Sequence, residues 1–198
     1  MSLLDMLTQK IGDGGVDEIS RTLGTDKQQT GAATGAALST ILGALARNSA
    51  SGDGASSLDR ALEKDHDGSI LDNLGGLLGG REQGAGDGIL KHVLGNRRPV
   101  VEQGLSQQTG LDASSVGKLM TMLAPVVMGA LGRQKRQSSL GAGDLGGLLG
   151  GERQALEQRD PQSTGLIGRL LDSDGDGDVD LSDIAKHGSG LLGKLFKG

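Results

Sequence analysis

Aromatic side chains are almost absent from the sequence. Phe196 is the only one among 198 residues, and there is no Trp or Tyr. Because aromatic side chains normally contribute much of the buried area of cores and interfaces, aliphatic side chains and Met must fill this core. The 37 glycines allow backbones to approach closely. We therefore expect small, tightly packed helices of modest stability.

Cysteine and long apolar runs are also absent from the sequence. Without cysteine, the chain forms no disulfides, has no thiol chemistry and offers no thiolate ligands to zinc. No stretch approaches the roughly 18 apolar residues that span a bilayer. The N-terminal residues lack the basic region and apolar run of a secretory signal. We therefore expect a soluble, cytoplasmic protein with no membrane partner.

The sequence has no excess of basic residues and no catalytic motif. The formal net charge is −5, part of it from one acidic segment near the C-terminus, so no broad basic surface is predicted. His66, His92 and His187 are far apart in the sequence. There is no nucleophile elbow, and the glycine runs lack the Lys-Ser/Thr ending of a phosphate-binding loop. We therefore expect no enzymatic activity.

The most distinctive segment is Asp172-Ser-Asp-Gly-Asp-Gly-Asp-Val-Asp-Leu-Ser-Asp183. As a twelve-residue calcium loop it has carboxylates at positions 1, 3, 5, 9 and 12, glycine at position 6 and an apolar residue at position 8. Asp183 at position 12 replaces the Glu of an EF-hand, as in dockerin modules, which the loop resembles. Asp178 is at position 7, where the backbone carbonyl usually binds. The candidate metal ligands are Asp172, Asp174, Asp176, Asp178, Asp180 and Asp183.

Calcium is the cofactor that this spacing favours. Closely spaced carboxylates repel one another unless a cation lies between them. Calcium takes six to eight oxygen ligands in a flexible frame, which suits a loop with many carboxylates better than the strict octahedron of magnesium. The alternative is an acidic, glycine-rich turn in solvent.

A second acidic segment has the same register but is incomplete. Glu63, Asp65 and Asp67 stand at positions 1, 3 and 5, followed by Gly68 at position 6. Position 12 is Leu74, so the closing carboxylate is missing. Ion affinity should be low unless Asp72 bends in, and the alternative is a turn with a helix cap.

Apolar spacing predicts three helices in the first 48 residues, over residues 3–11, 16–23 and about 26–47. Ser2 should cap the first helix, which ends at the glycines of residues 12–15. Thr25 or Asp26 should cap the third, and Thr25-x-x-Gln28 has the form of a capping box. Residues 48–56, rich in Ser, Gly and Ala, are expected to be a linker.

The same order of motifs returns 86 residues later, which predicts a duplicated three-helix unit. The second copy carries Pro125 inside its long helix, where it should kink or break the helix. The matched pairs are Leu3-Leu4 with Ile89-Leu90, Leu7 with Val93, Ile19-Ser20 with Leu105-Ser106, Gly24 with Gly110, Asp26 with Asp112, and residues 43–47 with residues 129–133.

Glycine appears in two further patterns. Gly31, Gly35, Ser39 and Gly43 recur every four residues, so another helix could pack closely on that strip. A Leu-Gly-Gly-Leu-Leu-Gly-Gly segment begins at Leu74 and again at residue 145. Because each glycine costs about 1 kcal/mol relative to alanine in a helix, these segments should become ordered only by packing their leucines.

Residues 105–116 have the glycine turn and apolar anchors of a helix-turn-helix. However, the second helix would expose only Lys118 as a basic group before turning apolar. The clusters at Arg97-Arg98 and Arg133-x-Lys135-Arg136 could flank a DNA-binding surface, but they are also typical of solvated helix ends. DNA is therefore possible as a partner but is not favoured.

Two motifs give the chain a resemblance to a known family. Asp65-His-Asp-Gly-Ser-Ile-Leu-Asp72 precedes the first Gly/Leu segment, and Leu123-Ala-Pro-Val-Val-Met-Gly-Ala-Leu-Gly132 lies in the second repeat. Together with the duplicated unit they resemble the bacterial domain of unknown function 937 family over most of residues 1–150. The chain also looks like the related YidB-like proteins, which implies a homeodomain-like helical motif. The resemblance implies a bacterial origin and transfers no activity.

We therefore predict an all-α protein with duplicated, homeodomain-like or helix-turn-helix-like three-helix units and a C-terminal EF-hand-like calcium loop. Its expected role is a calcium-binding structural or protein-interaction module. It should self-associate or bind another protein, because the Gly/Leu segments and residues 191–196 carry apolar side chains that a monomer need not cover. The alternative is a DNA-associated protein. The expected segments are residues 1–48 (first repeat), 49–85 (linker with the incomplete loop), 86–136 (second repeat), 137–162 (Gly/Leu-rich connector) and 163–198 (calcium loop with flanking helices).

Overall fold

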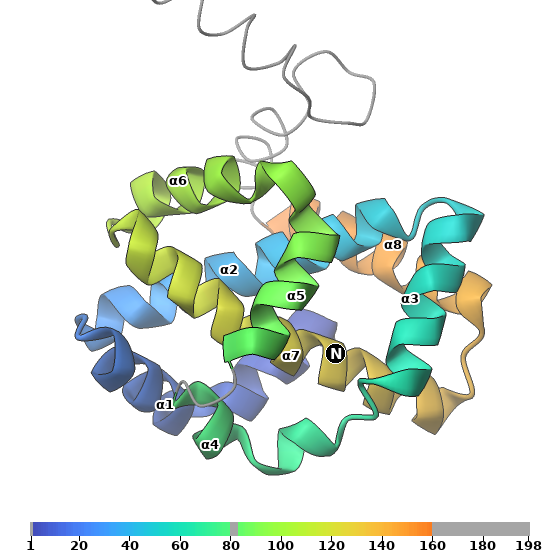
Figure 1. Ribbon diagram of the computed structural model, residues 1–198, viewed down its shortest axis with the longest axis horizontal. Coiled ribbons are helices and arrows are strands. Elements are labelled where there is room, and N and C mark those ends of the chain that lie inside the picture. Colours follow the sequence, from blue (N-terminus) through green and yellow to red (C-terminus); the bar gives the residue numbers. More distant parts are fainter. Residues whose placement is uncertain (1, 80–82, 160–198) are drawn as a thin grey trace, which may run out of the picture.

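The computed structural model describes residues 2–79 and 83–159, and all of these residues lie in helices or in the turns between them (Figure 1). The all-α prediction is confirmed for this part of the chain. The elements are α1 (Leu3–Leu23), α2 (Lys27–Asn48), α3 (Gly52–Lys64), η1 (Ser69–Asp72), α4 (Leu74–Leu78), α5 (Gln83–Leu94), η2 (Gly95–Arg97), α6 (Arg98–Thr109), α7 (Ala113–Ser138) and α8 (Ala142–Arg159), of which η1 and η2 are short 3-10 helices.

Helix α7 is the centre of the molecule. Every residue from Leu119 to Gly132 is buried. Helices α1, α2, α3, α5 and α6 all pack against α7 and together surround it. A helix that is apolar on all sides is stable only inside a fold, so the other helices are arranged around this one.

Helix α7 is also long and apolar enough to cross a membrane, which differs from the expectation drawn from apolar runs. Its hydropathy is high because Ala, Gly and Met separate the large aliphatic residues without adding charge. In the fold, 94% of the apolar window is buried. The helix therefore serves as a core helix in this structure.

The first three predicted helices are present, and the break between the first two is confirmed. Gly12 has φ 54° and ψ −174° inside α1, so its backbone is not helical and the two halves meet at a kink. Gly24 ends α1 in the left-handed conformation, which glycine adopts without steric cost. Asp26 caps α2 by accepting a hydrogen bond from the Gln29 amide, so the capping box that begins at Thr25 is not formed.

The chain turns in the same way after α6 as after α1. Gly110 is left-handed like Gly24, and Asp112 caps α7 through the Ser115 amide at 3.0 Å. The hydroxyl of Ser106 donates to the carbonyl of Leu111 at 2.7 Å. In the first turn, Ser20 makes the matching 2.6 Å hydrogen bond to the carbonyl of Thr25.

Pro125 lies in the middle of α7, yet the helix continues without the predicted break. A proline donates no backbone hydrogen bond, so the carbonyl of Thr121, four residues earlier, loses its helical partner. Gly86 of α5 lies against this carbonyl, because a Cβ there would be 1.9 Å from the Thr121 oxygen. The packed neighbours of α7 hold it together across the proline.

The glycine strip on α2 does not pack as expected. A Cβ added at Gly35 or Gly43 would meet nothing within 4 Å, and one at Gly31 would meet only Val16 at an ordinary 3.8 Å. The close helix approaches occur at glycines of α5 and α7 instead. The prediction was wrong for the described part of the chain, because α2 buries a neighbouring face that carries Leu38, Ile41 and Leu45.

The segment expected to be a linker contains α3. Ser51 caps this helix through the Gly54 amide, and Ala55, Leu58 and Leu62 form its buried face. The linker prediction was wrong because it weighted the local Ser and Gly content above the apolar spacing that follows. Packing against α7 and α8 stabilises the helix.

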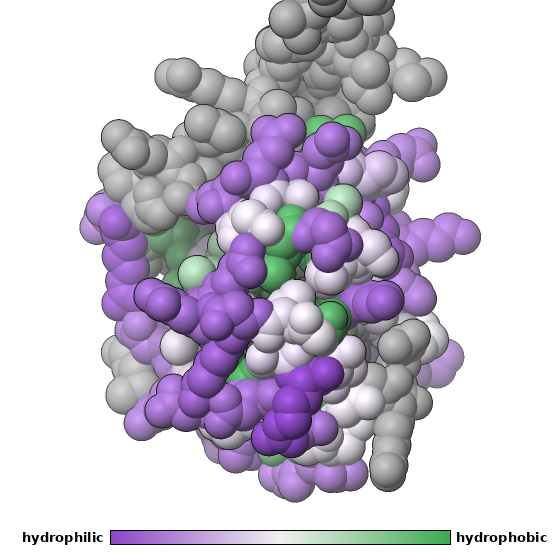
Figure 2. Space-filling view, turned by 90° about the vertical axis from the view of Figure 1, so that its left-hand side faces the viewer, coloured by the Kyte–Doolittle hydropathy of each residue, from purple (hydrophilic) through white to green (hydrophobic). Residues whose placement is uncertain are grey.

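Both Gly/Leu segments are ordered by packing within the chain. Leu77 and Leu78 of α4 are buried near α1, and Leu145 and Leu149 of α8 are completely buried, with α8 packed on α2 and α3. Leu74 and Leu148 are only partly buried, so most but not all of the apolar surface of these segments is covered within the chain. The expectation of self-association stays a prediction. The face drawn in Figure 2 likewise shows hydrophobic side chains only as small patches among hydrophilic ones.

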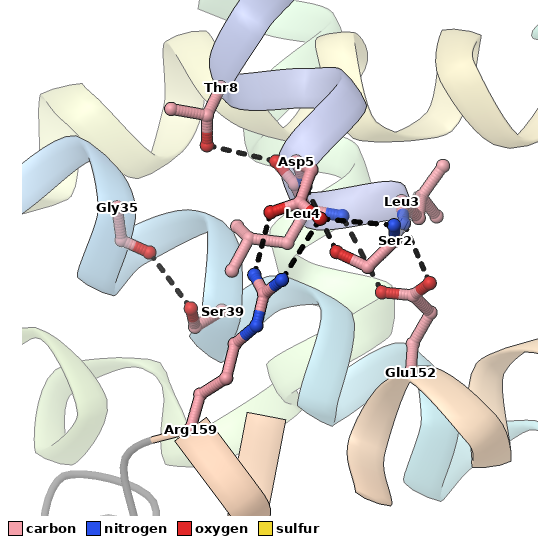
Figure 3. A network of polar contacts seen from close by, with 9 residues as sticks. All are labelled: Ser2, Leu3, Leu4, Asp5, Thr8, Gly35, Ser39, Glu152 and Arg159. Carbon is pink, nitrogen blue, oxygen red and sulfur yellow. Dashed lines mark hydrogen bonds and ion pairs between the residues drawn. The ribbon is translucent and has the colours of Figure 1, made fainter. Parts of the chain in front are cut away.

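Polar contacts fasten the last described helix to the first (Figure 3). The Glu152 carboxylate accepts hydrogen bonds from the amides of Leu3 and Leu4, at 2.6 and 3.5 Å, and so caps the start of α1. Arg159 makes two hydrogen bonds to Asp5, at 2.6 and 3.0 Å. These hydrogen bonds lower the pKa of Asp5 well below its usual range, with a further contribution from the Ser2 amide.

Candidate functional site: a groove between α3 and α5

An open groove lies between α3 and α5. Both helices pack against α7 but stand apart from each other (Figure 1), and residues of both line the groove. The groove has a volume of about 720 Å³. This size is within the range of sites that bind small molecules or short peptide segments.

The floor of the groove is apolar and comes from four helices. Leu58 of α3 and Ile89 of α5 are each 9% exposed, and both residues line the groove. An apolar ligand that covered this floor would gain hydrophobic free energy in proportion to the area removed from water. The floor residues are Leu45, Leu58, Ile89, Val93 and Met128.

The walls of the groove consist of small residues. On α5 they include Gly84 and Gly88, and a Cβ added at either position would meet nothing within 4 Å. On α3 the wall includes Ser57 and Ala61. Walls without large side chains let the backbone of a bound helix approach closely, so the groove fits an extended or helical segment better than a compact solute.

The rim carries acidic and imidazole groups. Asp53 and Asp65 are exposed, and His66 and His92 also line the groove. Desolvation lowers the pKa of the half-buried His66, against the opposing effect of the nearby Asp65 carboxylate. His66 is therefore neutral at pH 7, and two carboxylates give the rim its negative charge.

The incomplete acidic loop forms a tight turn beside the groove. Gly68 has φ 84°, so glycine stands where the register requires a sharp turn. Asp67 accepts hydrogen bonds from the amide and the hydroxyl of Ser69. Both hydrogen bonds lower the pKa of Asp67, and the bond from the Ser69 hydroxyl contributes more than the bond from its amide.

Two other carboxylates of this segment, those of Asp72 and Glu63, pair with cations on α7. Asp72 lies 2.7 Å from Arg133, and Glu63 lies 2.7 Å from Lys135. Within residues 2–79 and 83–159, no group of three His, Asp or Glu side chains is placed to hold a metal ion. The structure therefore favours the turn over an ion site at residues 63–72.

The turn is seated directly on α7. A Cβ added at Gly132 would be 1.8 Å from the His66 carbonyl oxygen, and one at Gly129 would be 2.5 Å from the Ile70 side chain. Arg133 donates a 2.9 Å hydrogen bond to the carbonyl of Gly68. The two motifs on which the family resemblance rests, residues 65–72 and 123–132, therefore pack against each other in the fold.

Lys135 joins α7 to α3 close to this turn. Its ammonium lies 2.7 Å from a carboxylate oxygen of Asp59 and 2.7 Å from one of Glu63, and its side chain is only 11% exposed. Burial alone would lower the pKa of Lys135, but the contacts with Asp59 and Glu63 outweigh it and raise the pKa. Lys135 is therefore charged and paired within the fold.

The basic clusters considered for DNA binding are largely neutralised inside the protein. Arg98 pairs with Asp87 at 2.8 Å and with Glu102 at 2.7 Å, and Arg133 and Lys135 pair as described above. The turn between α6 and α7 has helix-turn-helix features, but α7, the would-be recognition helix, is the buried core helix. Lys118 is the exposed basic residue near its start.

The six predicted calcium ligands, from Asp172 to Asp183, lie outside the described residues, as do the flanking apolar residues. The groove itself was not predicted. Its residues come from four helices, and one wall is the helix taken for a linker. A sequence signal was nevertheless present, because Gly84, Gly88 and His92 recur every four residues and share a face of α5.

Comparison with known proteins places the chain in a family without assigning an activity. No curated protein and no solved structure matches it. The family described as bacterial protein of unknown function (DUF937) matches residues 5–134, which include both motifs of the turn seated on α7. The chain therefore belongs to the DUF937 family of bacterial proteins of unknown function.

Proposed function

We propose that this protein is a calcium-binding protein-interaction module. The groove between α3 and α5 is the observation that supports the interaction role. It combines an apolar floor, walls of small residues and a charged rim. Proteins that bind amphipathic helices use grooves of this kind, in which apolar residues of the ligand enter the floor and its polar residues stay in water.

Calcium binding is the second half of the proposal, and the spacing of the aspartates from Asp172 to Asp183 supports it. A calcium ion would neutralise carboxylates that otherwise repel one another, and would fix the chain on either side of the loop. The carboxylates Asp59, Glu63 and Asp72 are already paired with Lys or Arg, so they are poor competitors for the ion.

Calorimetric titration of the chelator-treated chain tests calcium binding. We expect binding heat and a rise in melting temperature with calcium in the wild type, and neither in Asp172→Ala/Asp176→Ala. The control variant Asp13→Ala/Glu157→Ala removes the same number of charges elsewhere and should behave as the wild type. Absence of heat in the wild type would reject calcium, and unchanged binding in the first variant would reject the loop register.

A designed 18-residue Leu/Lys amphipathic helix tests the groove. Its titration should shift the amide NMR signals of α3 and α5 in the full chain that carries Leu192→Lys/Phe196→Lys, in which the chain's own apolar C-terminal residues do not compete for the groove. Gly88→Leu should abolish these shifts, because the new side chain projects into open space in the groove. Gly147→Leu, at an equally open glycine of α8, is the matched control. Shifts that are scattered over the surface, or that survive Gly88→Leu, would contradict this role.

The duplication and the DNA alternative remain proposals. The matching turns at Gly24 and Gly110, each followed by an aspartate cap, support two copies of one three-helix unit. The helix-turn-helix form of α6 and α7 is the observation that favours DNA binding. The burial of α7 and the ion pairs of Arg98, Arg133 and Lys135 count against it. Retention on duplex DNA that weakens with salt would favour this alternative.

A further inference from the structure

We propose that residues 188–198 of the same chain dock in the groove between α3 and α5, with their apolar side toward its floor. This inference rests on the proposed interaction role of the groove and names its occupant. It does not depend on calcium, since the groove is formed by described helices alone.

The apolar pattern of the segment matches the groove floor. Leu191, Leu192, Leu195 and Phe196 stand at spacings of one and four residues, which would place them on one face of a helix. Phe196 is the only aromatic side chain in the protein. A large apolar ring gains most from burial, and the thioether of Met128 in the floor is a favourable neighbour for it.

The charges of segment and rim are complementary. Lys194 and Lys197 flank the apolar positions of the segment. The groove rim offers Asp53 and Asp65. With the leucines and the phenylalanine on the floor, Lys194 would lie closer to the edge of the apolar face than Lys197, which would lie on the opposite side of the helix. A peptide with acidic flanks would be disfavoured by the acidic rim.

The connection is long enough to reach the groove. Residues 160–187 join Arg159 to the segment, and 28 residues span on the order of 90 Å when extended. A body of this size has a radius of gyration of about 15 Å. A connection of this length within one chain would give the segment an effective concentration approaching the millimolar range at the groove. Weak apolar contacts therefore suffice for docking within one chain, whereas a separate copy would need much higher affinity.

A single spin label tests the docking, and the absence of cysteine makes specific labelling simple. The label is attached to Gly198→Cys in the full ¹⁵N-labelled chain. We expect at least twofold loss of amide signal for Gly84, Gly88 and Ser57, relative to the reduced label. The α1–α2 and α6–α7 turns, at the far left of Figure 1, should keep their intensity. Uniform loss, or no loss at the groove, would overturn the proposal.

Two variants in the labelled chain make the test specific. Leu192→Lys/Phe196→Lys removes the apolar face, and Gly88→Leu fills the groove at a position where a side chain meets nothing within 4 Å. Both should restore the groove signals, whereas Gly147→Leu should not. Leucine is also a better helix former than glycine, so loss of folding would not explain the effect of Gly88→Leu. Persistent signal loss in Gly88→Leu would overturn the proposal.

Two further measurements separate the possible failures. Mixing spin-labelled ¹⁴N chain with unlabelled ¹⁵N chain detects docking between copies, and signal loss only in that mixture would overturn docking within one chain. If the designed Leu/Lys helix binds the groove but the label gives no groove effect, the tail proposal fails and the interaction role stands. If neither binds, both fail.

Discussion

At the scale of single residues, the glycines of α7 matter because of what touches them. Gly132 and Gly129 let the turn at residues 66–70 lie directly on the helix, whereas Gly35 on α2 faces open space. Glycine therefore has opposite effects at these positions. In α7 it permits packing, and in α2 it only lowers helix propensity.

Gly132→Ala should destabilise the protein by about 1–3 kcal/mol, because the new methyl group would overlap the His66 carbonyl and force the turn off α7. Gly35→Ala should instead stabilise it by about 0.5–1 kcal/mol. Urea unfolding followed by circular dichroism measures both changes. Equal effects of the two substitutions would contradict the close packing of the turn.

His66 should make stability depend on pH. Burial lowers its pKa in the folded state below the ordinary value of about 6.5, so the unfolded chain binds the proton more readily. The contribution of neutral His66 is complete above pH 6.5 and is lost as the pH falls toward the lower folded pKa. Between about pH 7.5 and 5.5, the melting temperature should fall more in the wild type than in His66→Gln. A parallel decrease in both proteins would show that other groups dominate.

Residue-level predictions from sequence succeeded where the cause was local. The roles of Gly24 and Asp26 follow from turn and cap chemistry within a few residues. The role of Gly86 could not be predicted, because it depends on a carbonyl freed by Pro125 in another helix. A sequence shows that a proline frees a carbonyl, but not which backbone will cover it.

At the scale of elements, two sets of contacts hold helix α8 in place. Its leucines pack on α2 and α3, and Glu152 and Arg159 bind the start of α1. A carboxylate at a helix N-terminus satisfies amides that have no partner within the helix and also interacts favourably with the helix dipole. The first and last described helices are therefore linked directly.

Glu152→Ala should cost about 0.5–2 kcal/mol, because the amides of Leu3 and Leu4 lose their acceptor. Hydrogen exchange should accelerate in the first turn of α1 and change little in α5. Glu157→Ala, which removes only an exposed ion pair with Arg153, should cost less than about 0.5 kcal/mol. If both variants lose the same stability, Glu152 is not a cap.

Elements were predictable where apolar spacing was strong. The helices that became α1, α2 and α7 were found, as was the break at Gly12. Helix α3 was missed because four of its first six residues are Gly or Ser, and its three buried positions acquire their value only from contact with α7 and α8. The groove was missed for the same reason, since α3 supplies one of its walls.

At the scale of the whole molecule, the described helices form one body. Its core runs from Leu3 to Leu156, beyond the end of the family match at residue 134. Helix α8 lies outside that match and yet covers α2 and α3. Helix α8 is therefore part of the core of the described residues, although it lies outside the family match.

A chain that stops after Arg159 should therefore fold cooperatively. In the presence of chelator, its melting temperature should lie within a few degrees of that of the full chain, because no core residue of the described body is removed. Adding calcium should stabilise the full chain but not the shortened one. Loss of cooperative unfolding on truncation would show that residues 160–198 belong to the core.

The burial of α7 on all sides has a consequence for synthesis on the ribosome. The chain emerges from its N-terminus, so α1, α2, α3, α5 and α6 leave the exit tunnel before the helix around which they pack. Their apolar faces stay exposed to water until Ser138 has emerged. Synthesis of the chain to this residue takes roughly 7–28 s at about 5–20 residues per second. The described fold therefore cannot be completed until its central helix, near the end of the described chain, has left the ribosome.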